Sequence, residues 1–257
     1  RVSFSLQTNG YAITEEWAAL FKENGFLIGI SLDGNKNQHD RYRIDEKGEG
    51  TFLRVIDKLK ILEKYKVDYN ALCVVTGNTD PVKAYSSLKR EGFSFLQFIP
   101  CLDPYEEERG KREFSLTPEK YSLFLSSTFD LWYRDWKNGK YTSVRLFDDY
   151  VHLAMGEAPS SCSVLGRCGG YIVVEADGSI YPCDFYVTDK WRIGIFSDFA
   201  TVDEVYRSKV MEDFLFEGSK EREECRKCQW RGLCNGGCRR DCDYMGKLGP
   251  NYFCSSF

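Results

Sequence analysis

The 257-residue chain has no apolar run near the roughly 18 residues that a membrane-spanning helix needs. It also lacks a strong excess of one charge, since 35 Lys and Arg residues stand against 39 Asp and Glu and leave a net charge of −4. We therefore expect no membrane and no nucleic acid among its partners. The chain has no initiator Met and no signal-peptide pattern, and it opens at Arg1 on a strand-like segment. We read it as a piece of a longer, cytoplasmic protein cut inside its fold.

Glycine-rich phosphate loops are missing too, because neither a Walker motif nor G-x-G-x-x-G follows any predicted strand. Nucleotide binding by those routes is therefore unsupported. The sequence contains no internal repeat and no low-complexity segment. With 42% hydrophobic and 29% charged residues, it is typical of a globular protein that buries a core without disulfides.

Over the first 150 residues, strand-like and helix-like segments alternate. The pattern predicts strands ending at residue 8 and over 26–31, 68–75 and 93–99, and helices over 14–24, 51–65, 80–91 and 117–138. Such alternation predicts a parallel sheet, either open and doubly wound or an arc of a barrel. Functional residues are then expected where the strands end.

Polar residues gather at those predicted strand ends. They are Gln7, Thr8 and Asn9, then Ser31 and Asp33, then Thr76 and Asn78, and finally Cys101, Leu102 and Asp103. This grouping is typical of the mouth of a cofactor or substrate site. Because the same residue types serve as turn and cap residues, we expect about half of these positions to do only that.

The eleven cysteines are unevenly distributed, and nine of them lie from Cys162 onward. An odd number without a signal peptide argues against a disulfide scaffold, and clustered thiols in such a protein more often bind metal. This region is predicted to hold a hairpin over 171–175 and 179–181, one helix over 202–214, and otherwise loops. Metal binding would supply the order that such a loop-rich segment needs.

The strongest local motif is Cys225-x2-Cys228-x5-Cys234-x3-Cys238. Four more cysteines accompany this motif: Cys162, Cys168 and Cys183 lie upstream, and Cys254 lies near the end of the chain. The eight thiols together are enough for two four-thiolate sites. Spacing alone fits zinc and iron–sulfur about equally. Of the remaining cysteines, Cys73 is predicted to be a core residue, Cys242 to be a spare thiol, and Cys101 is ambiguous.

This cysteine pattern, with the segment Tyr181-Pro182-Cys183-Asp184-Phe185-Tyr186, resembles the SPASM domain of radical S-adenosylmethionine enzymes. Four further motifs narrow the resemblance to one family among these enzymes: Ser5-Leu6-Gln7-Thr8-Asn9-Gly10, Ser31-Leu32-Asp33-Gly34, Leu96-Gln97-Phe98-Ile99 and Cys101-Leu102-Asp103-Pro104. Together they resemble anaerobic sulfatase-maturating enzymes over essentially the whole chain.

The resemblance implies an α/β fold in two parts. Residues 1–150 would be the later portion of a (β/α)6 radical S-adenosylmethionine partial barrel, and residues 151–257 a loop-rich SPASM domain with a β-hairpin and two auxiliary [4Fe-4S] clusters. One cluster would be held by Cys162, Cys168, Cys183 and Cys238, the other by Cys225, Cys228, Cys234 and Cys254. Ser31, Arg43 and Leu102 would contact S-adenosylmethionine, and Asp184 would be the catalytic base. Without the resemblance, Arg43 reads as a surface charge and Asp184 as a loop carboxylate.

The family's defining Cys-x3-Cys-x2-Cys motif, which holds a third, S-adenosylmethionine-cleaving cluster, is absent from the chain. We therefore expect the fragment alone to be inactive. The intact protein would oxidise a Cys or Ser of a sulfatase polypeptide to Cα-formylglycine, drawing electrons from a donor such as a flavodoxin or ferredoxin, and would be a monomer. Two alternatives remain: another SPASM peptide maturase that forms thioethers or crosslinks, and a non-enzymatic zinc-binding module.

Overall fold

The computed structural model describes residues 2–220 and 222–257, whose contacts divide the chain into two compact units. The first unit holds the chain up to Asp148 together with Ser255–Phe257, and the second is Asp149–Cys254. Each unit has its own β-structure, parallel in the first and antiparallel in the second. This division agrees with the α/β class that the sequence predicts.

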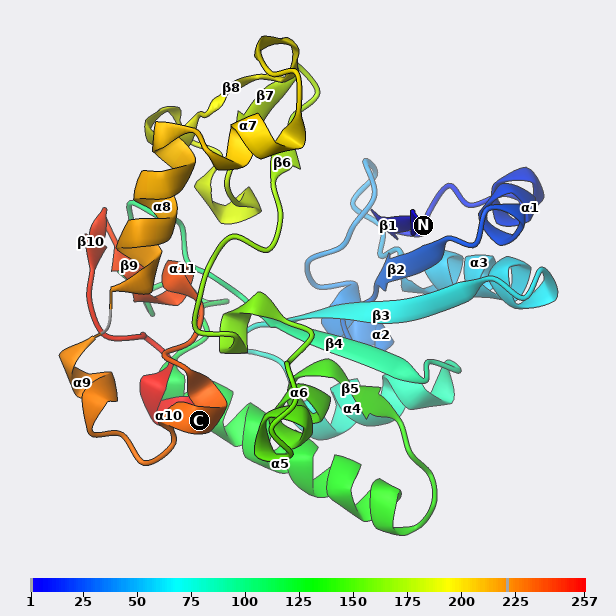
Figure 1. Ribbon diagram of the computed structural model, residues 1–257. Helices are drawn as coiled ribbons and strands as arrows, with labels where there is room; N and C mark the ends of the chain where they lie inside the picture. The colour runs from blue at the N-terminus through cyan, green and yellow to red at the C-terminus, as the bar shows by residue number, and fades with distance from the viewer. Residues whose placement is uncertain (1, 221) are drawn as a thin grey trace. The chain divides into compact units, whose positions relative to one another are not determined.

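The first unit is a five-stranded parallel sheet whose strands lie in chain order, β1-β2-β3-β4-β5. Its elements are β1 (Ser5–Thr8), α1 (Glu15–Glu23), β2 (Leu27–Ser31), α2 (Lys36–His39), α3 (Phe52–Lys64), β3 (Asp68–Val75), α4 (Pro81–Arg90), β4 (Phe95–Pro100), α5 (Pro118–Lys137), β5 (Ser143–Val144) and α6 (Arg145–Ala154), the last of which crosses into the second unit. The helices α1, α3, α4 and α5 follow the strands in the same order (Figure 1). Every carboxyl end therefore points to one edge of the sheet.

Consecutive buried residues occupy β2 and β3, which is typical of parallel strands covered on both faces. In β2 the side chains of Ile28 and Ile30 are fully buried, and in β3 the buried residues are Ala71, Leu72, Cys73 and Val75. The helices contribute an apolar stripe with helical spacing, such as Val55, Leu59 and Leu62 of α3. Burying these side chains together supplies the main driving force for this unit. Cys73, in β3, is a buried core residue as predicted.

Cap residues set the helix boundaries close to their predicted positions. The hydroxyl of Thr14 accepts a hydrogen bond from Trp17 N and begins α1, and the Asp80 carboxylate accepts one from Lys83 N and begins α4. Thr117 caps α5 in the same way, followed by Pro118 at the first helical position. After α1 the chain turns at Gly25, whose φ of 63° suits glycine.

The second unit is made of short elements joined by loops. They are the 3-10 helices η1 (Cys162–Val164), η2 (Asp184–Tyr186), η3 (Asp189–Trp191), η4 (Phe196–Asp198) and η5 (Cys254–Ser256), the helices α7 (Val202–Tyr206), α8 (Lys209–Ser219), α9 (Glu223–Arg226), α10 (Arg231–Cys234) and α11 (Arg239–Cys242), and the strands β6 (Val173–Val174), β7 (Ser179–Tyr181), β8 (Gly194–Ile195), β9 (Asp243–Tyr244) and β10 (Lys247–Leu248). The helix η5 ends in the first unit. Strands β6, β7 and β8 form one antiparallel sheet, and β9 pairs with β10 (Figure 1).

The predicted hairpin and the predicted helix of this unit have different outcomes. The hairpin is confirmed as β6 and β7, although β8 adds a third strand that was not predicted. The single helix predicted over 202–214 is wrong, because the chain forms α7 and α8 there. Ser208 has an extended backbone, and its side chain accepts a hydrogen bond from Met211 N, so it starts a new helix. Among residues 2–220 and 222–257, no helix is both long enough and apolar enough to span a membrane.

Candidate functional site

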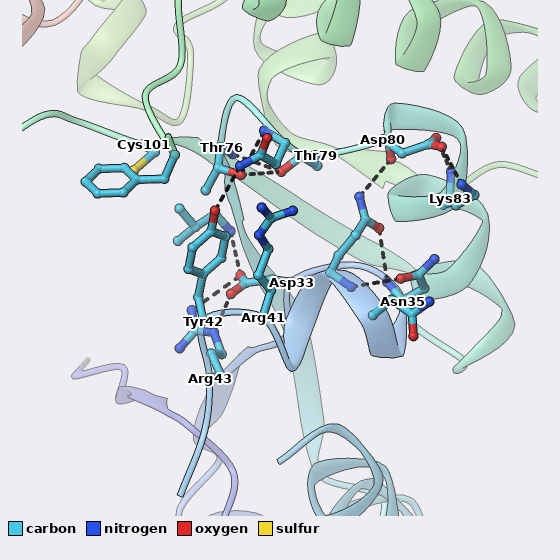
Figure 2. Close-up of a pocket in the computed structure, with 15 residues that line it drawn as sticks. Asp33, Asn35, Arg41, Tyr42, Arg43, Thr76, Thr79, Asp80, Lys83 and Cys101 are labelled. Atoms are coloured by element: carbon cyan, nitrogen blue, oxygen red, sulfur yellow. Dashed lines mark hydrogen bonds and ion pairs between the residues drawn. The ribbon is translucent and has the colours of Figure 1, made fainter. Parts of the chain in front are cut away.

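A cavity of about 470 Å³ opens at the strand ends of the first unit. Four of the polar residues predicted at strand ends line it: Asp33, Thr76, Asn78 and Cys101. Charged and amide side chains from the loop after β2 and from the start of α4 complete its wall (Figure 2). The lining is mostly polar, which suits a charged small molecule more than an apolar one.

An ion pair between Arg43 and Asp33 lies in this cavity. The Nε atom of Arg43 is 2.5 Å from Oδ2 of Asp33, and its Nη2 atom is 3.3 Å from Oδ1 (Figure 2). Oδ1 of Asp33 also accepts a hydrogen bond from Val74 N of β3 at 2.8 Å. The Arg43 side chain is 28% exposed and that of Asp33 is 12% exposed, so a solvated surface charge is the wrong reading of Arg43. The pair is two-pronged and fixes the orientation of the guanidinium group.

Behind this ion pair lies His39, a fully buried residue that the sequence did not single out. Its Nδ1 atom accepts a hydrogen bond from the backbone N–H of Asp33, and its Nε2 atom is 3.0 Å from Oγ1 of Thr51. The Thr51 hydroxyl in turn donates to the carbonyl oxygen of Arg43. Burial lowers the pKa of His39 to about 4, so the imidazole is neutral at pH 7. The network thus ties both members of the ion pair to one buried ring.

Side chains that cap helices form the opposite wall. Asn35 caps α2 in a capping box with Gln38, and the Gln38 amide donates to the carbonyl oxygen of Asp80, the cap of α4. The Asn78 amide donates to the hydroxyl of Tyr42 at 3.0 Å. Asn78 was among the polar residues predicted at strand ends, whereas Asn35, Gln38 and Asp80 were not.

The structure brings only one of the three predicted S-adenosylmethionine contacts into the cavity wall. Arg43 lines it. Ser31 is the last residue of β2, and Leu102 follows β4 two residues after its end, next to the lining residue Cys101. All three therefore lie where strands of the first unit end. Their contact with S-adenosylmethionine stays a prediction.

In the second unit, four cysteines line one pocket: Cys162, Cys168, Cys183 and Cys238, the first thiol set. Burial raises the pKa of Cys238, and the charges of Asp241, Cys162 and Cys183 raise it further. Burial also raises the pKa of Cys168, and Cys162 again contributes. These electrostatic contacts show that Cys238 neighbours thiols distant in sequence. A raised pKa keeps these thiols protonated, and a bound metal would have to displace their protons.

The other four cysteines form a second group: Cys225, Cys228, Cys234 and Cys254, the second thiol set. Burial raises the pKa of Cys234, and Cys254, Cys225 and Cys228 raise it further. Burial also raises the pKa of Cys254, and Cys225 and Cys228 raise it further. Among the described residues, no three His, Cys, Asp or Glu side chains stand close enough to hold a single metal ion.

The polar residues Asp149, which is buried, and Asn235, which is partly exposed, hold the cysteine loops in place. Asp149 accepts hydrogen bonds from Ser160 N and Ser161 N, which fixes the approach to Cys162. Asn235 reaches from the loop after Cys234 to the carbonyl oxygen of Val164 at 2.8 Å. These bonds join loops far apart in sequence around one pocket.

Two adjacent glycines let the chain turn before Cys238, so that Cys238 lies in the first thiol set and not in the second. Gly236 and Gly237 have φ values of 87° and 74°, and a Cβ at residue 237 would lie 2.0 Å from Nδ2 of Asn251. The amide of Asn251 donates to Gly236 O and accepts from Phe253 N, which positions the segment carrying Cys254. Only glycine fits here, because both the conformation and the close contact exclude a side chain.

Asp184, the predicted base, follows Cys183 directly and begins η2. The side chain is exposed, and Oδ1 accepts a hydrogen bond from the hydroxyl of Tyr171 at 2.5 Å and from Phe185 N at 3.1 Å. The Tyr171 hydroxyl is also 3.4 Å from Sγ of Cys183. One carboxylate oxygen is therefore held in place while the side chain stays accessible.

Comparison with known proteins decides the family. Residues 162–229 match the SPASM family, described as an iron-sulfur cluster-binding domain. The whole chain is 44% identical to the cysteine-type anaerobic sulfatase-maturating enzyme of Clostridium novyi (strain NT), covering 69% of it, and 98% of the chain is 47% identical to that of Clostridium perfringens (strain 13 / Type A), again over 69%. The chain belongs to the anaerobic sulfatase-maturating enzyme family.

The fold of this family member agrees with a solved structure. The structure of anSMEcpe with bound AdoMet and Kp18Cys peptide superposes with a TM-score of 0.96 at 46% identity, over 99% of the chain and 71% of that protein. The predicted family, the radical S-adenosylmethionine fold and the SPASM domain are thereby confirmed. The residue assignments remain predictions. The sequence reasoning missed His39, Tyr171 and Arg239, because their importance depends on contacts between distant segments.

Proposed function

We propose that the intact protein oxidises a Cys or Ser side chain of a sulfatase polypeptide to Cα-formylglycine, with S-adenosylmethionine and [4Fe-4S] clusters as cofactors. The observation that carries this proposal is the division of eight thiols into two groups of four in a member of this family. The match of residues 162–229 to an iron-sulfur cluster-binding domain supports clusters over zinc at these thiols. The proposal places residues 1–150 in the partial barrel and 151–257 in the SPASM domain.

Each thiol set would hold one cluster. The first would be bound by Cys162, Cys168, Cys183 and Cys238, the second by Cys225, Cys228, Cys234 and Cys254. When bound, the cofactors supply radical cleavage of S-adenosylmethionine and an outlet for electrons. The protein's own part is to position the substrate, to move protons and to keep the thiols in place.

Asp184 would remove a proton from the substrate thiol or hydroxyl. Its exposed carboxylate is accessible to a polypeptide, and the hydrogen bond from Tyr171 fixes the orientation of the carboxyl group. A positioned carboxylate can act as a general base while the electron leaves by another route. Ser31, Arg43 and Leu102 would bind S-adenosylmethionine, and the Arg43 guanidinium is suited to its carboxylate.

The remaining expectations concern the cell. We expect the protein to act in the cytoplasm, a reducing compartment in which clustered thiols more often bind metal than form disulfides. The protein would act as a monomer and would receive electrons from a small donor protein such as a flavodoxin or ferredoxin.

Anaerobic reconstitution tests the proposal. This chain should bind about eight iron atoms and a matching amount of acid-labile sulfide, and it should absorb broadly near 400 nm. The matched control is a variant with Cys73→Ala, which removes a buried core thiol and should keep the full iron content. Stoichiometric zinc without sulfide would overturn the cluster assignment. In a protein that also carries Cys-x3-Cys-x2-Cys, a sulfatase-derived peptide should gain formylglycine, whereas thioether formation would favour the alternative peptide maturase.

A further inference from the structure

A buried arginine lies beside the first thiol set. Arg239 follows Cys238 and begins α11, and its side chain is only 3% exposed. It lines the same pocket as the four thiols. An arginine side chain stays charged even when buried, and a buried charge needs compensating partners. Two observations indicate the role of Arg239: the contacts of its guanidinium group, and the lack of an acceptor for its Nε–H among the described residues.

Three aromatic rings and two acceptors hold the guanidinium group. Nη1 donates to the carbonyl oxygen of Phe214 at 2.7 Å, and Nη2 donates to Oε2 of Glu217 at 2.8 Å. The guanidinium carbon lies 4.2 Å from the ring centre of Phe214 and 4.9 Å from those of Tyr186 and Trp191. Cation–π contacts and charge-assisted hydrogen bonds therefore fix the plane of the group.

The compensation is nonetheless incomplete. Among the described residues, no acceptor lies within hydrogen-bonding distance of Nε of Arg239, although this atom is buried. The Glu217 side chain is 34% exposed, so water screens its negative charge more than the positive charge of Arg239. A buried N–H without an acceptor is costly. The pocket lined by the four thiols thus adjoins the charged side chain of Arg239 and a buried N–H group that has no acceptor among the described residues.

The arginine and the thiols approach each other closely. A Cβ on Gly218 would lie 3.2 Å from Sγ of Cys168 and 3.7 Å from Cδ of Arg239, so the thiol and the arginine stem flank the same point on α8. Cys168 and Cys183 also pack against the aromatic cluster of Tyr186, Trp191 and Phe214.

We propose that Arg239 raises the reduction potential of the cluster held by the first thiol set. This inference rests on the ligand set of the proposed function. Reduction adds one electron, and so one negative charge, to an already anionic group. A fixed cation and an N–H donor in the wall of the pocket would stabilise the more negative state, and both are known determinants of cluster potentials. A higher potential would favour acceptance of the electron that substrate oxidation releases.

Two substitutions of opposite sign test the proposal. Arg239→Met removes the charge and the donor but keeps an apolar stem against the rings, whereas Glu217→Gln removes the negative partner and keeps the arginine. Both are measured in the anaerobically reconstituted chain by potentiometric titration, with electron paramagnetic resonance of the reduced clusters. At a fixed potential, Arg239→Met should lower the ratio of reduced to oxidised cluster at least tenfold, a shift of about 59 mV for one electron. Glu217→Gln should shift the potential in the opposite direction.

Two further measurements make the result decisive. Arg239→Lys keeps a charge without the planar donor group, so its potential should lie between those of the wild type and Arg239→Met. The cluster of the second thiol set is the internal reference and should keep its potential in every variant. If Arg239→Met binds full iron at an unchanged potential, the proposal is wrong. If Arg239→Met fails to bind iron, Glu217→Gln decides, and an unchanged potential there overturns the proposal. Absence of clusters in the wild type would instead contradict the proposed function.

Discussion

The backbone N–H of Asp33 donates a hydrogen bond to Nδ1 of His39, 3.2 Å away, and this bond fixes the protonation state of the ring. Because Nδ1 accepts and the Thr51 hydroxyl already donates to Arg43 O, the proton of the neutral imidazole lies on Nε2 and points to Thr51. The ring can serve both partners only while it is neutral. The geometry around Arg43 therefore depends on His39 staying unprotonated.

This dependence predicts acid sensitivity of the first unit. The pKa of His39 is lowered from 6.5 to about 4, mainly by burial and also by Arg43, while Asp33 and Asp40 act in the opposite direction. The unfolded chain therefore binds a proton more readily, and stability contributed by the neutral ring is present above pH 6.5 and lost as the pH falls toward 4. The loss should be about 3 kcal/mol in the free energy of unfolding, measured by anaerobic urea titration followed by circular dichroism.

Carboxylates such as Asp40 also destabilise on acidification, so a matched pair of variants isolates the histidine. His39→Asn keeps an acceptor near Asp33 N but cannot titrate, and the loss of stability between pH 6.5 and 4 should shrink. The exposed His152 is the other histidine of the chain, and His152→Asn should change the free energy of unfolding by no more than about 0.5 kcal/mol. Identical pH profiles for the wild type and His39→Asn would contradict this assignment.

The ion pair between Arg43 and Asp33 leads to a second prediction, which concerns the binding of S-adenosylmethionine. Arg43→Lys keeps the charge but loses the two-pronged geometry, so affinity should fall about tenfold or more, the equivalent of one charge-assisted hydrogen bond. Arg41 lines the same cavity but pairs with the exposed Glu113, so Arg41→Lys is the matched control and should bind normally. Equilibrium dialysis with a protein that also carries Cys-x3-Cys-x2-Cys measures both. Equal losses in the two variants would remove Arg43 from the contact set.

Local patterns predicted most of the first unit because local physics decides it. Thr14, Asp80 and Thr117 cap helices within the range of a few residues, and the apolar run of β3 is visible in its own eight residues. The strand ends followed from topology alone, since parallel strands bring their carboxyl ends together. Asp33, Thr76, Asn78 and Cys101 were therefore predictable as neighbours.

Long-range contacts could not be predicted in the same way. The spacing of Cys225, Cys228, Cys234 and Cys238 favours one four-thiolate site, yet Cys238 neighbours Cys162 and Cys183 instead. The turn at Gly236 and Gly237, braced by Asn251, causes this exchange, and only the resemblance to the family anticipated it. Arg239 reads as a surface charge in sequence because its aromatic partners lie 25 residues or more away.

The thiol exchange supports a third prediction. Cys238→Ser should lower the iron content by about half, since one of two clusters loses a ligand. Cys242 is the matched control: it is buried, and its thiol donates to the carbonyl oxygen of Cys238 at 3.3 Å, a bond that a serine hydroxyl can replace. Cys242→Ser should therefore bind the full amount of iron. Iron analysis under anaerobic conditions checks both, and equal losses would show that the ligand set is wrong.

The last prediction concerns Asp184 in a protein that also carries Cys-x3-Cys-x2-Cys. Asp184→Asn keeps the size of the side chain and an oxygen that can accept from Tyr171 and Phe185 N, but it removes basicity. Substrate oxidation should stall while S-adenosylmethionine cleavage continues, because only the proton-transfer step is impaired. Loss of a general base costs about 10²–10⁴ in rate, so formylglycine should fall at least a hundredfold.

A purely structural role for Asp184 predicts a different outcome. If the carboxylate only supports the loop of Cys183, the Asn variant should lose iron, and formylglycine and 5′-deoxyadenosine should decline together. Tyr171→Phe removes the hydrogen bond to Asp184 without changing its charge, so formylglycine formation should fall less than in Asp184→Asn. Mass spectrometry of the peptide and chromatography of 5′-deoxyadenosine, both normalised to bound iron, separate the two roles. Near-normal formation of formylglycine by Asp184→Asn would exclude this residue as the base, because the amide of asparagine cannot accept the substrate proton as a carboxylate does.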